Sequence, residues 1–225
     1  MKPAGSVWEA IGDAPESLAD WATTKLSEVI VLGELLPGEP LVIKTLSEQL
    51  GISVTPLREA LQRLTTLGLV TQRNRRAWVT PLSHAELTDI YEMRQMLEPL
   101  AVERSVGAAS DAWIVALTQA RDEMAEAAQR GAMAFELAHR KFHLTLIDCC
   151  PSPYLRRFVA TLLDGSARYR MVAIKHADYS TLEHERLYEA ARRRDGATTS
   201  RLALDHIVRL THDQVEALKA RGLLQ

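Results

Sequence analysis

Four histidines are the residues of this chain whose type and spacing could most directly support chemistry. His139 and His143 stand four residues apart in a stretch with helical periodicity, so both rings project from one helix face. His184 lies one turn into a later helical stretch, and His206 lies in the middle of the last one. Helices of a bundle can direct such rings into a shared interior, where imidazole nitrogens favour zinc, nickel, copper or iron over magnesium or calcium. The spacing therefore indicates a metal site, with a solvated helix face as the alternative.

A metalloenzyme built on these histidines is a second hypothesis. It would need an open coordination position and a nearby general base. The pair His139 and His143 lacks the internal glutamate of the HExxH motif, and the chain contains no nucleophile elbow and no phosphate loop. We therefore expect a protein that is not an enzyme.

The histidines belong to a long helical region that begins after residue 80. Ser83 and Glu86 have the spacing of a capping box, and Ser180 and Glu183 have the same spacing later in the chain. No strand pattern occurs between them or after them. Short connections between antiparallel helices predict a bundle. The six predicted helices cover about Glu86–Ala109, Asp111–Gln129, Ala132–Cys149, Tyr154–His176, Leu182–Arg194 and Ala197–Ala220.

The region before the bundle predicts a helix-turn-helix. Two short helical patterns flank Gly51, and the second begins near Ser53, with Ser53 or Thr55 as its N-cap. Arg58 and Gln62 lie one turn apart on the polar face of this second helix, which is the candidate recognition helix. Its predicted buried face consists of Leu57, Ala60, Leu61, Leu64 and Leu67.

Two short strand patterns follow, at residues 68–73 and 77–80, around a polar turn at 74–76. An amphipathic helix at about Ser17–Leu35 precedes the helix-turn-helix and the two strands. The predicted fold is therefore mainly α, with an N-terminal winged helix-turn-helix and a C-terminal all-helical antiparallel bundle. We expect a flexible arm at residues 1–15, a DNA-binding domain at 16–80, and a domain for effector binding and dimerisation at 83–225.

Charge supports nucleic-acid binding by the first domain. Residues 44–80 hold six basic and two acidic side chains, a local charge of +4, whereas the whole chain carries −2. A basic module in a mildly acidic chain is typical of a phosphate-binding surface. The candidate DNA contacts are Lys44, Thr55, Arg58, Gln62, Arg63, Arg75 and Arg76.

Composition favours a cytoplasmic location. No stretch reaches the roughly 20 apolar residues of a membrane span, and acidic residues interrupt the N-terminus where a signal peptide would be apolar. The two cysteines, Cys149 and Cys150, are adjacent and cannot form an ordinary disulfide. We expect no association with a membrane.

Both halves resemble one family of bacterial regulators. The first half is similar to the DNA-binding domain of GntR-type transcription regulators, on residues 36–41, 46–53, 55–61 and 67–70. The second half is similar to the FCD ligand-binding domain of their FadR subfamily, on residues 93–101, 142–143 and 183–186 with Asp195 and His206. The resemblance covers about residues 18–215. It implies a homodimer that binds a short pseudo-palindromic operator, as a repressor in our expectation, and that responds to a small organic acid.

The same resemblance implies a divalent metal held by one aspartate and three histidines. His143, His184 and His206 match the histidines, whereas His139 stands where the family has the aspartate. A neutral imidazole in place of a carboxylate leaves about one more positive charge on a bound M²⁺, which favours later transition metals and an anionic ligand. We expect zinc or nickel, with iron or manganese as alternatives, and Glu136 as an outer partner. Alternatively, His139 does not ligate and the metal is weak or absent.

Arg94 matches an arginine that tends to line the effector pocket in this family, and Arg168 and Arg170 are further candidates. A bidentate pair with an effector carboxylate is the expected role, and a salt bridge between Arg94 and Glu98 is the alternative. The DNA-binding half departs from the family at Val54, where an arginine is usual, and at Arg76, where a glycine is usual. These departures predict an operator that differs from the usual one. A constitutive DNA-binding protein whose helical half only dimerises is the remaining hypothesis.

Overall fold

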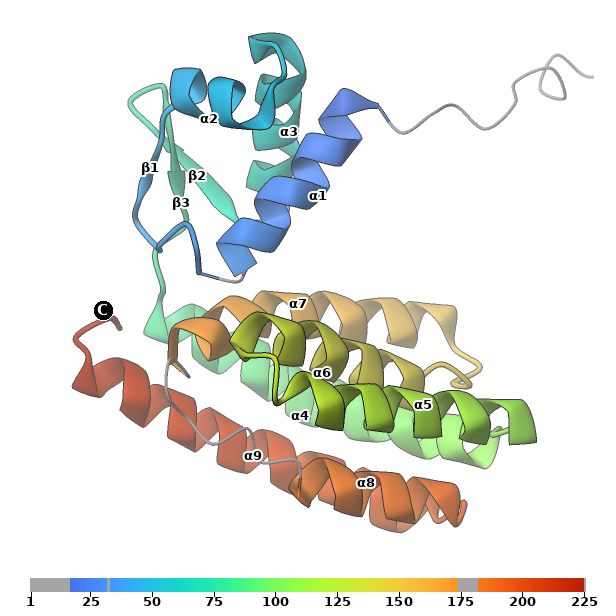
Figure 1. The fold of residues 1–225 in the computed structure, drawn as a ribbon. Helices are drawn as coiled ribbons and strands as arrows, with labels where there is room; N and C mark the ends of the chain where they lie inside the picture. Colours follow the sequence, from blue (N-terminus) through green and yellow to red (C-terminus); the bar gives the residue numbers. More distant parts are fainter. Residues whose placement is uncertain (1–16, 32, 174–181, 225) are drawn as a thin grey trace, which may run out of the picture. The chain divides into compact units, whose positions relative to one another are not determined.

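The computed structural model of this protein describes residues 17–31, 33–173 and 182–224 (Figure 1). The chain divides into two compact units. The boundary lies after Pro81, and the short segment 31–33 is grouped with the second unit. The expected arm at residues 1–15 lies outside the described residues.

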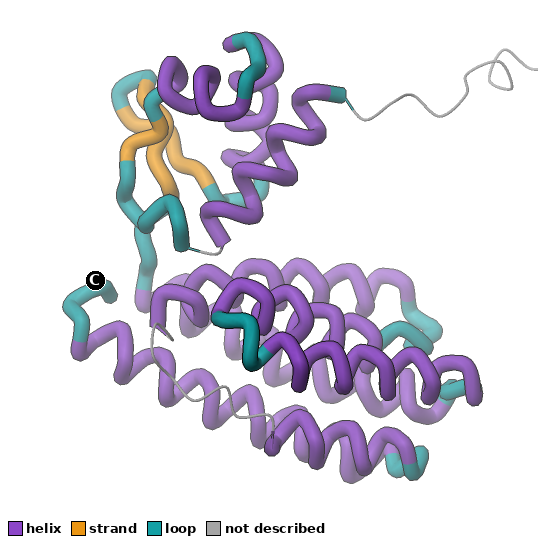
Figure 2. The backbone as a smooth tube through the Cα atoms, in the orientation of Figure 1, coloured by secondary structure: helices purple, strands orange, loops and turns teal. Residues whose placement is uncertain are grey.

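The first unit is a winged helix-turn-helix, as predicted. Its helices are α1 (Leu18–Val31), α2 (Ile43–Leu50) and α3 (Val54–Thr66). Its sheet contains β1 (Pro40–Leu41), β2 (Val70–Arg73) and β3 (Arg76–Val79) in the antiparallel order β1-β3-β2. Figure 2 shows the helices and the three short strands of this unit. The sequence did not predict β1, because two residues are too few for a strand pattern.

The turn between α2 and α3 depends on Gly51, which has φ +65° and caps the C-terminus of α2. A residue with a Cβ resists this left-handed conformation. Leu57, Leu61 and Leu64 are buried, as the helical pattern predicted. The prediction for Leu67 was wrong: α3 ends at Thr66, and Leu67 is 62% exposed because the chain turns there before the wing begins.

The wing is the hairpin of β2 and β3, joined by Asn74 and Arg75. Both turn residues have positive φ, 52° and 62°. Across the hairpin Thr71 faces Trp78 and Arg73 faces Arg76. The wing therefore has a two-residue turn with Arg75 at its second position, and Arg76 is the first residue of β3.

The second unit is the predicted bundle. Ser83 caps the first helix through its hydroxyl, which accepts a hydrogen bond from the Glu86 N–H at 3.4 Å. The second predicted capping box begins at Ser180, outside the described residues. The helices are α4 (His84–Gly107), α5 (Asp111–Ala127), α6 (Ala132–Leu146), α7 (Pro153–Ala173), α8 (Leu182–Arg192) and α9 (Gly196–Ala220).

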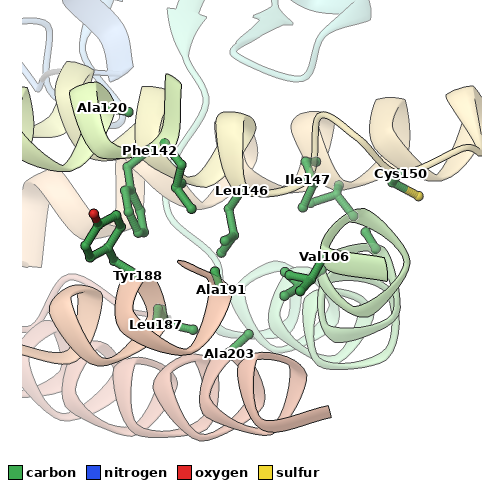
Figure 3. Packing of buried hydrophobic residues seen from close by; sticks show 14 of the residues in the cluster. Val106, Ala120, Phe142, Leu146, Ile147, Cys150, Leu187, Tyr188, Ala191 and Ala203 are labelled. Atoms are coloured by element: carbon green, nitrogen blue, oxygen red, sulfur yellow. The ribbon is translucent and has the colours of Figure 1, made fainter. Parts of the chain in front are cut away.

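In the main core of the bundle, α6 packs against helices that come earlier and later in the sequence, among them α4 and α8. Figure 3 shows Phe142 and Leu146 of α6 beside Tyr188 and Ala191 of α8, with Val106 of α4 nearby. A second buried cluster holds the start of α4 and the end of α7 together; it consists of Leu82, Leu87, Tyr91, Tyr169, Val172, Ile207 and Leu218. In the described part of the chain, none of the helices combines the length and apolarity that crossing a membrane requires.

Candidate metal centre and DNA-binding surface

The bundle brings all four predicted histidines together. His139 and His143 come from α6, His184 from the first turn of α8, and His206 from the middle of α9. All four side chains are buried, and one ligand atom from each lies within 4.8 Å of the others. The ring centroids of His139 and His143 are 4.5 Å apart, and those of His184 and His206 are 4.7 Å apart. The alternative of a solvated helix face for His139 and His143 is therefore wrong.

Two of the histidines are oriented by carboxylates. His143 Nδ1 lies 3.0 Å from Glu98 Oε1, and His206 Nδ1 lies 2.7 Å from Glu183 Oε2. A proton on each Nδ1 donates to the carboxylate and leaves Nε2 with its lone pair available. This carboxylate–histidine arrangement is the usual support of metal-binding imidazoles.

The nitrogen positions fit a metal ion. His143 Nε2 and His184 Nε2 are 3.3 Å apart. Zinc–nitrogen bonds of about 2.0–2.1 Å in a tetrahedron separate two nitrogens by roughly 3.3 Å. In addition, His139 Nδ1 and His206 Nε2 are shielded from solvent and have no hydrogen-bond partner among the described residues. Buried polar atoms without partners are costly, and a metal ion would satisfy both.

The imidazoles of His139 and His143 are held neutral, which is the form that binds a metal. Burial lowers the pKa of His139 well below its ordinary value, and the neighbouring His143 lowers it further. Burial likewise lowers the pKa of His143 to about 4, although Glu98 opposes the shift. For Glu183, burial alone would raise the pKa, but the bonds from His206 and Arg209 outweigh it and lower the pKa to about 2.

Two of the predicted effector residues, Arg94 and Arg170, lie in the same buried network. Arg94 Nε donates to Glu98 Oε2 at 2.9 Å, so the salt bridge that the sequence offered as the alternative role of Arg94 is present, and it connects Arg94 to His143. Arg170 Nε donates to Glu136 Oε2 at 2.8 Å. Both guanidinium groups also donate to the Ser166 hydroxyl, at 3.1 and 3.3 Å.

Arg168 occupies a different place. Its guanidinium pairs with Glu86 of α4 and stacks over the Tyr169 ring, 4.9 Å from the centroid. Tyr169 in turn donates to Glu86 and bonds the backbone of Ser83. Arg168 therefore supports the start of α4, whereas Arg94 and Arg170 share the network of the histidines.

The buried network has no surplus negative charge among its described residues. Burial would raise the pKa of Glu98, but the charge of Arg94 and the bond from His143 overcome burial and lower it. Every carboxylate that bonds to a histidine or to a network arginine has a guanidinium beside it. The three pairs are Glu98 with Arg94, Glu136 with Arg170, and Glu183 with Arg209.

Sequence reasoning missed the roles of Glu98 and Glu183 beside the histidines. The sequence pattern pairs Glu98 with Arg94 and places Glu183 in a capping box, and the motifs of the family resemblance include both residues without a role at the histidines. No local signal shows that they face His143 and His206, because both contacts join residues far apart in the sequence.

The predicted DNA contacts are exposed on the first unit. Lys44, Thr55, Arg58 and Gln62 lie on α2 and α3, and Arg75 and Arg76 lie at the wing tip. Arg63 differs from the other arginines because its guanidinium pairs with Asp20 of α1. The hydrogen bonds that Asp20 accepts from Ser17 and then from Arg63 lower the pKa of its carboxyl group.

A winged helix-turn-helix joined to a helical domain with a buried polar site defines a class of proteins, the DNA-binding transcription regulators. Comparisons with known proteins agree. Residues 18–79 match the family described as bacterial regulatory proteins, gntR family, and residues 89–209 match the FCD domain. The chain belongs to the GntR family of bacterial regulators and carries an FCD domain.

Two relatives illustrate the similarity. The chain is 29% identical to the HTH-type transcriptional repressor GlaR of Escherichia coli strain K12, over 81% of this chain and 89% of the relative. It is 30% identical to the HTH-type transcriptional regulator BphR of Paraburkholderia xenovorans, over 93% of this chain and 88% of the relative. The structure of E. coli McbR/YncC shares the fold, with a TM-score of 0.76 and 22% identity over 88% of this chain and 99% of that one. These relatives are transcription regulators, and the prediction that the protein is not an enzyme is confirmed.

Proposed function

We propose that this protein is a ligand-responsive repressor whose helical domain holds a divalent transition metal on His139, His143, His184 and His206. The observation that carries the proposal is the convergence of four buried imidazoles, two of which have shielded nitrogen atoms without a hydrogen-bond partner in the described part of the chain. Zinc or nickel suits a site made of nitrogen ligands, and iron or manganese is the alternative. A bound metal supplies a positively charged centre that can take an additional ligand.

A small carboxylate is the effector that the charges favour. Four neutral imidazoles leave the charge of M²⁺ uncompensated, and each nearby carboxylate already has its own arginine. An anion is therefore the ligand that such a centre attracts. Arg94 and Arg170 are proposed to contact the effector, because both join the histidine network through buried groups. We retain Arg168 as a weaker candidate, since its guanidinium pairs with Glu86 at the start of α4 and not with the network of the histidines.

On DNA, we propose a homodimer that places two recognition helices and two wings on an operator. Arg58 and Gln62 on α3 are the proposed base contacts, and Lys44, Thr55, Arg63, Arg75 and Arg76 are proposed to contact the backbone or the minor groove. GlaR is a repressor, and that name supports the same direction of control here. Binding to bacterial operator DNA would place the protein in the cytoplasm.

Elemental analysis of the purified, untagged protein tests the metal site. We expect about one equivalent of zinc, nickel, iron or manganese per chain in the wild type, and loss of that metal in His143→Ala, because a buried ligand is removed. His212→Ala is the matched control, since His212 is exposed on the same helix as His206. It is expected to keep the metal.

The absence of metal from the wild type, even after reloading with each of these ions, would contradict the proposed site. The protein would then be a metal-free or constitutive regulator. If metal is present, carboxylates should raise the thermal stability of the loaded protein more than that of the metal-free protein, because a ligand stabilises the state that binds it.

A further inference from the structure

The balance of charge in the four-histidine site favours reversible binding of a metal ion. The described ligands of this site are His139, His143, His184 and His206. An imidazole binds a metal in its neutral form, so these ligands cancel none of the charge of a divalent ion. The carboxylates that bond to two of the rings, Glu98 and Glu183, are each paired with an arginine. A bound ion would keep most of its charge in a buried environment, where an uncompensated charge is costly. We therefore expect occupancy to follow the supply of the ion.

Metal binding would change how three helices of the bundle are joined. His143 Nε2 of α6 and His184 Nε2 of α8 lie 3.3 Å apart, so a proton on one of these atoms forms a hydrogen bond to the other. His139 Nδ1 of α6 and His206 Nε2 of α9 have no hydrogen-bond partner among the described residues. A bound ion would replace the proton between the first two atoms and would be a partner for the other two. The metal-free and metal-bound proteins therefore differ in the bonds between α6, α8 and α9.

The ligands are also connected to α4, the helix that directly follows the DNA-binding unit in the chain. His143 Nδ1 lies 3.0 Å from Glu98 of α4, and Glu98 pairs with Arg94 one turn earlier. Arg94 donates to the Ser166 hydroxyl of α7 at 3.1 Å, and the same helix holds the first turn of α4 through the Tyr169 hydroxyl. Hydrogen bonds and ion pairs therefore connect the histidines to the start of α4.

We propose that the metal ion is itself a regulatory signal, and that loading of the four-histidine site changes the affinity for DNA without any carboxylate. The inference rests on the metal site of the proposed function and adds a second signal to the carboxylate. Coupling between two binding sites is reciprocal, so bound DNA must change the affinity for the metal by the same factor. We expect a factor of about five or more. Nitrogen ligands favour zinc or nickel over magnesium, so magnesium should have no such effect.

Fluorescence anisotropy of a labelled DNA duplex, selected from a random-sequence library by the protein as purified, measures this coupling. The full-length protein is made metal-free on a chelating resin and kept in a buffer that contains no carboxylate. Zinc sulfate is expected to change the dissociation constant of the duplex by about fivefold or more, whereas magnesium sulfate at the same concentration should not change it. Isothermal titration calorimetry of zinc into the protein, with and without the duplex, should give the same factor.

Two substitutions on α9 test whether zinc acts through the site. His206→Gln removes a ligand and is expected to abolish the response to zinc, while the metal-free variant still binds the duplex. His212→Gln, at an exposed position of the same helix, is the matched control and should keep the response. Circular dichroism reports whether both variants are folded. A response to zinc that survives in His206→Gln would place the effect outside the site and overturn the inference.

His139→Asp tests the argument from charge. A carboxylate at this position compensates part of the charge of the ion, so the zinc concentration at half response should fall by about tenfold or more. An unchanged concentration would overturn the inference that charge keeps the ion exchangeable. Zinc that stays on the wild-type protein through the chelating resin would also overturn it, since an ion that never leaves carries no signal.

Binding of zinc and the response to zinc are separate outcomes of these experiments. If the calorimeter shows one equivalent of bound zinc per chain and the affinity for the duplex is unchanged, the inference is overturned and the proposed metal site stands. If the protein binds no zinc, the inference and the proposed metal site are both overturned.

Discussion

At the scale of single residues, the histidines of the cluster differ in whether a carboxylate contacts the ring nitrogen. Glu98 and Glu183 contact the Nδ1 atoms of His143 and His206, and each carboxylate is paired with an arginine. The carboxylates thus orient the rings without adding net charge to the site. His139 has no such support for its Nδ1 atom among the described residues. It is therefore the residue whose role depends most on a bound metal.

Replacing His139 with aspartate tests whether this position ligates. We expect His139→Asp to raise the affinity for manganese relative to nickel, because a carboxylate adds a hard oxygen ligand and a negative charge. The ratio should change by on the order of tenfold or more, the size seen when a supporting partner of a metal ligand is altered. Isothermal titration calorimetry of the metal-free protein with each ion measures it.

His212→Asp provides the comparison, since it introduces the same charge on an exposed position of α9. That variant should leave the ratio of affinities unchanged. An unchanged ratio in His139→Asp as well would show that His139 does not ligate.

At the scale of elements, α7 serves two sites at once. Ser166 and Arg170 face the network of the histidines, whereas Arg168 and Tyr169 hold Glu86 and Ser83 at the start of α4. Such contacts by adjacent residues are possible because the end of α7 is buried on most of its circumference. A change near the histidines therefore lies within a few residues of the contacts that anchor the segment following the wing.

A substitution in the hairpin turn of the wing should raise the stability of the first unit and weaken its binding to DNA. Arg75 has φ +62° at the second position of a two-residue turn, where glycine is favoured after asparagine. Arg75→Gly is expected to stabilise the first unit by about 1 kcal/mol, the cost of a left-handed residue with a Cβ. The same variant should weaken DNA binding and lower the salt slope by about 0.9 per subunit.

Differential scanning calorimetry and salt-dependent DNA titration measure the two effects. Arg75→Ala separates them, because it removes the charge and keeps the Cβ. It should match Arg75→Gly in the salt slope and show no gain in stability. A gain of equal size in Arg75→Ala would mean that charge repulsion, and not backbone strain, destabilises the turn.

At the scale of the whole molecule, α4 offers a surface for the proposed homodimer. Met93, Met96 and Leu100 lie on its outer face and are 36%, 67% and 39% exposed. A twofold axis between residues 96 and 97 of two antiparallel α4 helices would bring Asp89 of each copy opposite Arg104 of the other. Both of these residues are exposed. The outer face of α4 formed by these five residues is therefore apolar at its centre and self-complementary in charge at its ends, as an interface between identical copies requires.

Met96→Glu is expected to shift the protein from dimer toward the monomer mass of 25.1 kDa, because two buried carboxylates would meet near the twofold axis. Size-exclusion chromatography with light scattering measures the mass. Val115→Glu on α5, where the valine is 57% exposed, is the control and should not change it. A dimer that survives Met96→Glu at low micromolar concentration would place the interface elsewhere.

Local sequence signals were enough to predict most helices and strands of this protein. Helical periodicity, Gly51 and the serine at position 83 located the helix-turn-helix and the start of the bundle, because these signals act within a few residues. The pairing of His139 with His143 on one face of a helix was likewise readable from their spacing. The short strand β1 and the exposed Leu67 were missed, because local patterns are weakest at the ends of elements.

Contacts between residues far apart in the sequence could be seen only in the folded protein. The approach of His184 and His206 to the pair on α6, and the placement of Glu98 and Glu183 behind the rings, depend on how α8 and α9 rotate against the core. The same packing turned Arg168 toward Glu86 and left Arg94 and Arg170 with the histidines. Periodicity shows that a helix has a buried face, but long-range packing selects the partner that each buried side chain contacts.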